Sequence, residues 1–437
     1  MKKFRSLLEN NLYLAVLLTP LRVIGIIILP FLARYLCHKY HIVFTAYSKI
    51  LIFFLFVSSF LGLLQGTTLL TNVLLSLWIY IPILILYSSK FVNSCKSLLE
   101  NLMWLSSWLL LLIDSLGFVT YFYNRNDDEF GVPYGSHFNG VHGLALLNAF
   151  VVLYYLSFLI QRKANRQDKF FLFFFLISFI MCFNGLLLVL LSVVLISYIL
   201  FKVRTKQILM GIAFLSVFFM YIYYVNSDNI NYIVSSISIF YNNDDVEKPR
   251  KVEMFQKAYR RLKTQDFLSL LFGNGPGSYN GRVAFMLNTE SNNVFTDLLG
   301  HSMPILHKKD VFELWNEDLY SMPYNDGTIN RPHVSLISLI IENGLIFTFV
   351  FLCYWIVQIK RGFKLQNKDP LALFYYFSLL FMLLCVCFEQ WIESTEFIFF
   401  LIIIGLTKPL INNTSFACME LSGVNSRCLP ASGACES

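Results

Sequence analysis

Charge is the scarcest property of this sequence. Only 14% of its 437 residues are charged and 57% are hydrophobic, with 44 Phe and 24 Tyr. Soluble domains contain about 25% charged residues, so the composition argues against a water-soluble protein. Apolar runs recur along the chain, each long enough to cross a hydrocarbon core roughly 30 Å thick. The net charge of +7 does not favour nucleic acid as a partner, because most basic residues lie in short segments between apolar runs.

Cysteine is missing from the longest polar segment. All nine cysteines lie outside residues 226–333, so no disulfide can staple that segment. Cys385 and Cys387 stand two apart within an apolar run, too sparse for a zinc site, and we interpret them as packing residues. The segment also lacks the Gly-Lys-Ser/Thr ending of a phosphate-binding loop and an Asp-x-Asp pair. Neither a metal ion nor a cofactor is predicted.

The apolar runs predict an all-α integral membrane protein with about twelve transmembrane helices and one large, mainly helical external loop. Nine crossings fall within residues 1–225, the loop is 226–333, three crossings fall within 334–411, and 412–437 is expected to be a disordered cytoplasmic tail. Two long runs are divided, at Asn184-Gly185 and at Pro20. The predicted crossings are 7–19, 22–36, 42–64, 68–88, 98–123, 138–160, 170–183, 185–201, 207–225, 334–358, 371–388 and 392–411.

The distribution of basic residues predicts the orientation. With twelve crossings and both chain ends inside, the internal segments hold nearly all the Lys and Arg of the short connections, including the run from Arg162 to Lys169. The last external turn, Glu389 to Glu396, is acidic instead. This is the positive-inside pattern. Within apolar runs, Lys49 and Asp114 are secondary functional candidates, although a structural pair or snorkelling side chains would explain them equally well.

A basic stretch opens the second half of the external loop. On a helix over 250–272, Arg250, Lys257 and Arg261 share one face, while Phe255 and Tyr259 lie on the other. A cationic stripe just outside a membrane suits a phosphate or pyrophosphate group. A solvated helix face, or attraction to anionic lipid head groups, is the alternative interpretation.

Two further features follow the basic stretch. Gly273-Asn274-Gly275-Pro276-Gly277-Ser278 predicts a tight turn whose backbone can approach a ligand closely, or a simple structural bend. His333 precedes the next apolar helix and could act as a general base toward a hydroxyl, or merely cap the helix. His301, His307 and Asp310 match no metal-ligand spacing, and we expect them on the surface.

The order of these features resembles the bacterial O-antigen polymerase and O-antigen ligase superfamily. The matching segments are Arg250-Lys251-x-x-x-Phe255-x-x-Ala258, then Gly273-x-Gly275-x-Gly277-Ser278-Tyr279, then His333-x-x-x-Ile337-x-x-x-Ile341-Glu342-Asn343-Gly344. Residues 131–139 also resemble a family stretch that precedes a membrane helix. The family has Trp where Phe255 stands here and Asn where Val334 follows His333.

The resemblance implies a metal-independent glycosyltransferase of the GT-C type. Its donor would be an oligosaccharide on undecaprenyl pyrophosphate, and the external loop would be periplasmic, in a multi-pass protein of the bacterial inner membrane. His333 would activate the acceptor hydroxyl, and arginines would neutralise the leaving pyrophosphate. The residues assigned by the resemblance are His333, Arg250 and Arg261 as catalytic, and Lys251, Lys257, Arg260, Arg331, Gly275, Gly277 and Glu342 as substrate-binding.

The acceptor distinguishes the two activities within the family. A polymerase extends another lipid-linked repeat unit, whereas a ligase transfers the glycan to lipid A–core, and the Phe- and Tyr-rich composition favours the polymerase. The partners implied are the lipid-linked oligosaccharide, the bilayer, a chain-length regulator and a flippase. A transporter for the same lipid-linked sugar is the competing class, because twelve crossings with intramembrane charges would suit one.

Overall fold

The computed structural model describes residues 22–91, 96–124, 127–134, 137–182, 184–202, 250–288, 300, 303–314, 332–367 and 369–423. The predicted crossings at 7–19 and 207–225, together with Arg331, lie outside these residues. The statements below concern the described residues.

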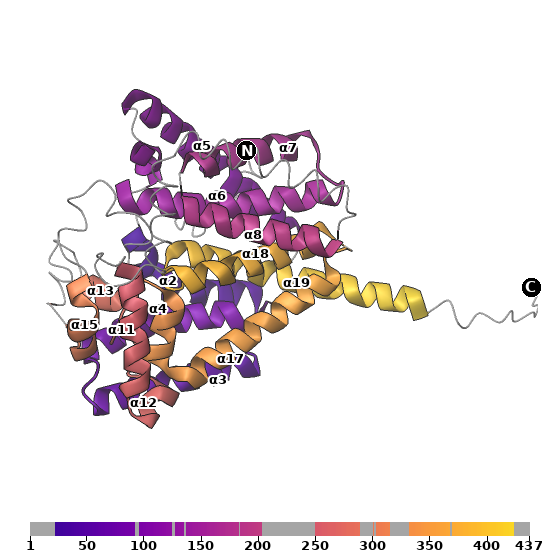
Figure 1. Cartoon of the computed structure of the whole chain (residues 1–437). Helices are drawn as coiled ribbons and strands as arrows, with labels where there is room; N and C mark the ends of the chain where they lie inside the picture. The colour runs from indigo at the N-terminus through magenta and orange to yellow at the C-terminus, as the bar shows by residue number, and fades with distance from the viewer. Residues whose placement is uncertain are drawn as a thin grey trace, which may run out of the picture.

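The first half of the described chain is a series of helices (Figure 1). They are α2 (Arg22–Tyr40), α3 (Ala46–Leu64), α4 (Leu70–Ser88), α5 (Lys96–Asn124), the 3₁₀ helix η1 (Asp127–Tyr134), α6 (His137–Ile160), α7 (Arg166–Met181) and α8 (Gly185–Lys202). Two short strands, β1 (Ile42–Val43) and β2 (Lys90–Phe91), pair antiparallel with Ile42 opposite Phe91.

The second half contains short helices followed by three long ones. The short ones are α11 (Arg250–Thr264), α12 (Phe267–Phe272), α13 (Arg282–Asn288), α15 (Ile305–Asp310) and the 3₁₀ turn η2 (Phe312–Leu314). The long ones are α17 (Ser335–Leu365), α18 (Pro370–Phe388) and α19 (Thr395–Gly423).

Six helices, namely α3, α4, α5, α6, α17 and α18, are long and apolar enough to cross a membrane. Each coincides with a predicted crossing, so the chain is an all-α, multi-pass membrane protein. Four more predicted crossings coincide with α2, α7, α8 and α19. The predicted break in the long run after residue 170 is confirmed, because α7 ends at Met181 and α8 begins at Gly185.

Aromatic packing holds the centre of the bundle together. Phe150 of α6 stacks on Phe400 of α19 with ring centroids 5.2 Å apart, and Tyr154 meets Phe374 of α18 edge-on at 5.3 Å. All four rings are buried. In a bilayer, close van der Waals packing of this kind drives helix association, because lipid tails are as apolar as the side chains. The outer side chains of α3, by contrast, are exposed as lipid-facing residues should be.

The helix connections sort into two ends of the bundle. At one end, Thr45 Oγ1 donates to Ser88 O at 2.7 Å, and Gln161 Nε2 donates to Gln366 O at 2.7 Å. We call this the basic end, because the predicted internal Lys and Arg of these connections lie there. The opposite end, the loop end, holds α11 to α15 and the turn 389–394. The two sets of connections alternate along the chain as the charge pattern predicts.

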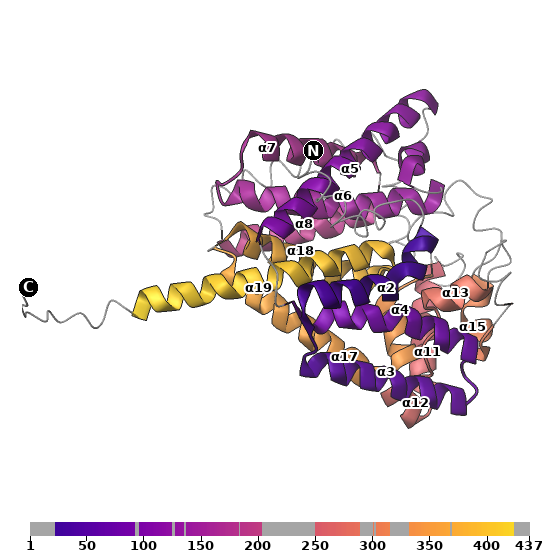
Figure 2. The same cartoon turned by 180° about the vertical axis from the view of Figure 1, so that it is seen from behind.

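The last helix differs from the prediction. The polar tail was expected from residue 412, but α19 continues to Gly423 and its final turns project beyond the bundle (Figures 1 and 2). Residues 412–423 contain no proline or glycine before Gly423. A helix can therefore continue past the apolar run until a glycine ends it.

Candidate functional site

The helix α11 runs across the loop end, at a steep angle to the long helices (Figure 1). It packs on a small apolar cluster separate from the main core, which we call the loop core. Its members are Met254, Ala258, Tyr279, Leu306, Val311, Leu314, Val334 and Ile341. The buried face of α11 is therefore the one that carries Lys251, Met254 and Ala258, while Phe255 and Tyr259 are exposed.

The helix α17 is broken close to its beginning. Gly344 has φ +83°, outside the helical region, about 14 Å along the helix from Ser335. The break frees backbone carbonyls at membrane depth, where an unpaired group costs several kcal/mol. Asn274 N donates to Ile341 O at 3.0 Å, and Gly275 N donates to Glu342 O at 2.9 Å. The turn after α12 thus fills the break in α17.

The carboxylate of Glu342 organises the rest of this turn. It accepts the backbone N–H groups of Gly277 at 2.9 Å, Tyr279 at 3.1 Å and Gly281 at 2.7 Å. Glu342 is fully buried. We call residues 273–281 and this carboxylate the glycine cradle. These three hydrogen bonds tie residues 277–281 to the start of α17.

The same turn packs directly on α3 and α4. A Cβ on Gly62 would lie 2.5 Å from Asn274 O, so only glycine permits this approach. Thr67 Oγ1 donates to Asn274 O at 2.7 Å, and Asn72 Nδ2 donates to Gly277 O at 3.0 Å. The predicted tight turn is confirmed by positive φ at Gly273, Gly275 and Gly277. The surface that its backbone approaches is protein.

A second buried carboxylate, Glu393, lies beside the cradle in the turn before α19. Tyr80 OH donates to it at 2.5 Å, and the backbone N–H of Arg282 donates to its other oxygen. A Cβ on Gly281 would lie within 3.1 Å of both Glu342 and Glu393. Burial raises the pKa of Glu393, and the Tyr80 and Arg282 contacts oppose that shift.

This raised pKa predicts a stability change with pH. Because the folded-state pKa lies above the unfolded value of about 4.3, the contribution of Glu393 is present at low pH and is lost as pH rises through the folded-state pKa. The melting temperature of the detergent-purified protein should therefore fall as pH rises above about 4.3, and fall less in Glu393→Gln. An identical fall in the variant would exclude Glu393 as the cause.

His333 lies where the glycine cradle meets the start of α17. Asn280 Nδ2 donates to the carbonyl of Pro332, the residue before it. Two residues after it, Ser335 N donates to Glu389 O at 3.0 Å. His333 is partly buried. The prediction that it lies at the helix start is confirmed, and the contacts on both sides fix its backbone.

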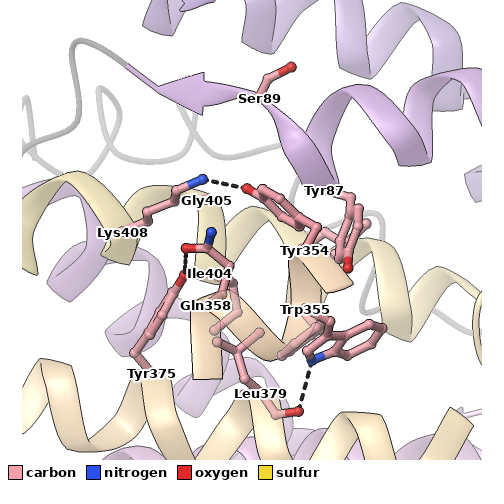
Figure 3. Close-up of a pocket in the computed structure, with 12 residues that line it drawn as sticks. Tyr87, Ser89, Tyr354, Trp355, Gln358, Tyr375, Leu379, Ile404, Gly405 and Lys408 are labelled. Atoms are coloured by element: carbon pink, nitrogen blue, oxygen red, sulfur yellow. Dashed lines mark hydrogen bonds between the residues drawn. The ribbon is translucent and has the colours of Figure 1, made fainter. Parts of the chain in front are cut away.

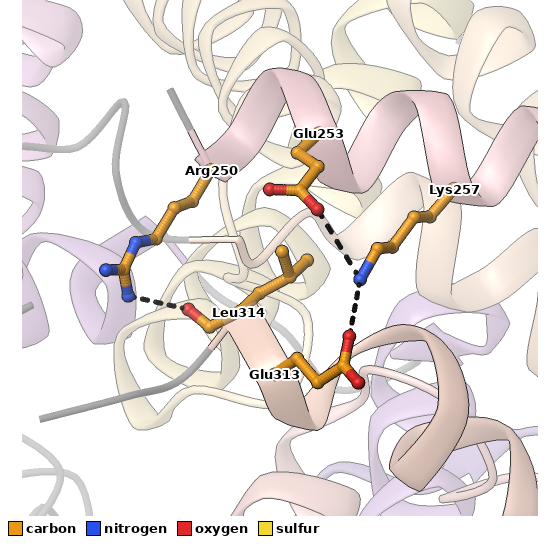
Figure 4. Close-up of polar contacts among 5 residues, drawn as sticks. All are labelled: Arg250, Glu253, Lys257, Glu313 and Leu314. Atoms are coloured by element: carbon orange, nitrogen blue, oxygen red, sulfur yellow. Dashed lines mark hydrogen bonds and ion pairs between the residues drawn. The ribbon is translucent and has the colours of Figure 1, made fainter. Parts of the chain in front are cut away.

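Three predicted basic site residues are engaged within the protein. Arg250 donates to Leu314 O at 3.0 Å, and Lys257 forms ion pairs with Glu253 at 3.5 Å and Glu313 at 3.4 Å (Figure 4). These contacts tie α11 to η2.

Lys251 is the third, and it is buried, donating to Phe388 O at 2.8 Å. This bond satisfies a carbonyl at the C-terminal end of α18, where a positive charge is favoured. Arg260 is exposed and Arg261 is partly buried. Of the predicted cations on α11, these two are the ones whose side chains can meet a ligand.

The outer side of α12 continues the lipid-facing surface. Phe272 stacks on Phe54 of α3 with centroids 6.3 Å apart. Phe267 and Leu268 are exposed, as is Phe60 on α3. We infer that this short helix meets the bilayer, and the C-terminal turn of α11, which carries Arg260 and Arg261, lies directly before it. A phosphate group at the membrane interface would meet Arg260 there.

A photoreactive residue at position 267 should label lipid. We expect Phe267→p-benzoyl-phenylalanine in proteoliposomes to give phospholipid adducts on irradiation, detected by mass spectrometry of the protein. The matched control is Ile305→p-benzoyl-phenylalanine, because Ile305 is also exposed but lies on α15, farther from the long helices (Figure 1). Equal labelling at both positions would contradict the placement of α12.

The other titratable residues considered in the sequence lie apart from one another or play packing roles. His307 was expected on the surface, which is wrong: it is buried and its Nδ1–H donates to Tyr279 O at 2.5 Å. Burial lowers the pKa of His307, and this hydrogen bond opposes the shift. Lys49 is exposed near the start of α3, whereas Asp114 is buried and accepts from Asn148 Nδ2 at 3.1 Å. The two are not a pair.

A small cavity lies near the basic end, between α4, α17, α18 and α19 (Figure 3). Its polar lining is internally paired: Lys408 Nζ donates to Tyr354 OH, and Tyr375 OH donates to Gln358 Oε1 at 2.9 Å. A ligand would have to displace these bonds. The cavity lies near the end opposite the glycine cradle and adds nothing to the candidate site.

The structure thus brings Gly275, Gly277 and Glu342 into direct contact and places His333 beside them. Arg250 and Lys257 contact η2 instead. Sequence reasoning missed Tyr80 and Glu393, and it placed His307 on the surface. Glu393 carried a visible signal, an acid between two apolar runs, but nothing in the sequence showed its partners.

No family model matches the chain, and no curated protein has significant sequence similarity to it.

Proposed function

We propose that this chain is a membrane-embedded glycosyltransferase that joins oligosaccharide repeat units carried on undecaprenyl pyrophosphate, as an O-antigen polymerase does. One observation carries the proposal. The basic helix α11, the glycine turn and the segment from His333 to Gly344 are separate in the sequence, yet they pack together at one end of the bundle. These are the three segments on which the resemblance rests.

The orientation of the bundle belongs to the same proposal. We place the basic end in the cytoplasm, because Lys and Arg in short connections are retained there. The loop end then faces the periplasm of a bacterial inner membrane, and twelve crossings put both chain ends inside. A lipid-linked donor could approach along α3 and α12, whose exposed apolar residues face the bilayer.

The reaction needs a base and a cation. The acceptor hydroxyl attacks the anomeric carbon of the donor, a glycosidic bond forms, and the bond to the pyrophosphate breaks. In our proposal His333 takes the proton of the hydroxyl, and Arg261 with Arg260 stabilises the charge on the departing pyrophosphate. Arg331, outside the described residues, stays a candidate for the same role. Glu342 holds the turn instead of touching the substrate.

The transporter alternative is less favoured by the contacts. A broken membrane helix often marks a transport site, where the freed backbone groups face a cavity or an ion. In α17 the freed carbonyls of Ile341 and Glu342 are occupied by the N–H groups of Asn274 and Gly275. The break therefore has a structural use.

The direct test is reconstitution of the purified chain with an undecaprenyl-pyrophosphate-linked repeat unit. A ladder of longer lipid-linked glycans supports a polymerase. Glycan found only on added lipid A–core would make the chain a ligase. Movement of the substrate across the vesicle membrane with no new glycosidic bond would make it a transporter.

The basic residues of α11 should differ in how much each contributes to polymer formation. We expect Arg261→Ala to lower polymer formation by about a hundredfold, because loss of one charged contact to a transition state costs about 3 kcal/mol. Arg250→Ala should lower it less than about tenfold, because its guanidinium is engaged by Leu314 O. Initial rates in proteoliposomes measure both. The reverse order would mean that the face toward η2 carries the site.

A further inference from the structure

Three basic residues meet at the basic end of the bundle, where three membrane helices leave the hydrocarbon. Lys90 lies two residues after the end of α4, Arg361 lies in the last turns of α17, and Lys408 lies where the apolar run of α19 ends. The positive charges of Lys90 and Arg361 both act on the Lys408 ammonium. Three separate crossings thus bring three like charges together, and like charges repel one another.

The small cavity at this end explains how the three converge (Figure 3). Its lining includes Ser89, Gln358 and Lys408. Lys90 is the residue after Ser89, and Arg361 follows Gln358 by three positions on the same side of α17. Ser89 and Gln358 are buried, whereas Lys90 is exposed and Arg361 is partly exposed. The two outer cations therefore stand at the mouth of the cavity.

Lys408 carries the charge that is hardest to leave unpaired. Its Nζ donates to Tyr354 OH and lies 4.9 Å from the centre of that ring. Among the residues that the structure describes, no carboxylate forms an ion pair with Lys90, Arg361 or Lys408. A partly buried ammonium group among like charges is unfavourable unless a negative charge offsets it. The bond to Tyr354 uses one of its three hydrogens, so the others can donate to an anion.

The position of the three residues in the membrane selects the ligand. Phospholipid phosphates lie just outside the hydrocarbon core, at the level where membrane helices end, and basic pockets between such helices bind anionic head groups. A guanidinium and two ammonium groups supply the donors that a phosphate accepts. The exposed Val357 lies one turn before Arg361 on α17, so an acyl chain can lie directly beneath the head group.

We propose that Lys90, Arg361 and Lys408 bind the phosphate of an anionic phospholipid at the basic end of the bundle. The phosphate lies at the mouth of the cavity, whose interior stays closed by its own hydrogen bonds. The bound lipid offsets the repulsion among the three cations and so holds α4, α17 and α19 together. The site is independent of the proposed glycosyl transfer, which belongs to the opposite end.

Binding can be measured on the full-length protein by native mass spectrometry, with phosphatidylglycerol added to the detergent solution. The variants are Lys90→Gln and Arg361→Gln, because both side chains reach the surface. The matched control is Lys360→Gln, which removes an exposed charge one residue from Arg361, on a different side of the helix. We expect each site variant to weaken binding about tenfold, as loss of one hydrogen bond to a charged group does. Equal weakening in all three variants, or no phosphatidylglycerol bound to wild type, would overturn the proposal.

Melting temperatures distinguish an anionic lipid from other sources of phosphate. Phosphatidylglycerol should raise the melting temperature of wild type by mass action, and phosphatidylcholine, which has no net charge, should raise it less. Lys408→Gln keeps a donor for Tyr354 OH and removes one of the three like charges. It should therefore be as stable as wild type without lipid and lose most of the gain from phosphatidylglycerol. The same rise with phosphatidylcholine, or the full rise with inorganic phosphate alone, would contradict an anionic-lipid site.

Discussion

Glu342→Ala is expected to abolish the folded loop end and with it any activity of the chain. Three N–H groups, those of Gly277, Tyr279 and Gly281, donate to this carboxylate. Without it they would be buried and unpaired, at a cost of about 1–3 kcal/mol each. The sum is comparable with the whole stability of a typical domain, about 5–15 kcal/mol. We expect a large fall in the melting temperature of the purified protein, or failure to accumulate in the membrane.

Two further variants complete this test: a conservative change at Glu342 and a control at another acidic residue. Glu342→Gln keeps one acceptor oxygen but points an NH₂ group at N–H donors, so its effect should be intermediate. Glu253→Ala is the control for removal of an acid from the same end, because its ion pair with Lys257 is partly exposed and such pairs contribute at most about 1 kcal/mol. If Glu342→Ala and Glu253→Ala had the same melting temperature, the glycine cradle would not depend on the Glu342 carboxylate.

The helices could be predicted because few backbone conformations are possible in lipid. A chain in hydrocarbon must satisfy its own backbone, so long apolar runs become helices. The predicted run 371–388 matches α18 to within one residue, and the predicted run 42–64 ends with α3 at Leu64 but begins four residues before it. The break at Asn184-Gly185 was visible for the same reason, since one run was too long for one crossing.

The sequence predicted the two faces of α11 but not which of them packs inward. Phe255 and Tyr259 were placed on the face opposite Arg250, Lys257 and Arg261. In the structure both are exposed, while Lys251 is buried. At a bilayer edge, exposed aromatic residues meet lipid, and a buried lysine can bind a carbonyl at a helix end. Hydropathy alone cannot distinguish a lipid-facing residue from a core residue.

The role of Glu342 could not be derived from spacing. The sequence shows an acid before Asn343-Gly344, which the resemblance interprets as a substrate contact. Its partners are backbone groups of a turn far earlier in the chain, and only the packing of that turn into the break of α17 brings them within reach. Backbone donors carry no signature in the side-chain pattern. The glycines at 277 and 281 were visible in the sequence, but it did not show that their N–H groups donate to the Glu342 carboxylate.

Gly344→Ala should be as damaging as the loss of Glu342, for a steric reason. A Cβ on Gly344 would lie 2.4 Å from Leu271 O and 2.5 Å from Gly273 N, both backbone atoms. With φ +83° and ψ 169°, the backbone of Gly344 also lies in a region essentially confined to glycine, which adds about 1–3 kcal/mol for any residue with a Cβ. To avoid these clashes, the glycine turn and α12 would have to move away from α17. That movement would break the hydrogen bonds from Asn274 and Gly275 to the carbonyls of α17. We expect the melting temperature and the polymer yield to fall together.

Gly66→Ala is the control for a glycine with positive φ but no close contact. Gly66 has φ +66°, yet no atom lies within 4 Å of its added Cβ. Alanine there should cost only the backbone strain of about 1–2 kcal/mol, a loss of a few degrees in melting temperature. The difference between the two variants therefore measures how tightly the glycine turn is seated in the break of α17. Equal losses would mean that the turn can withdraw without consequence, and the glycine cradle would then not be a fixed part of the site.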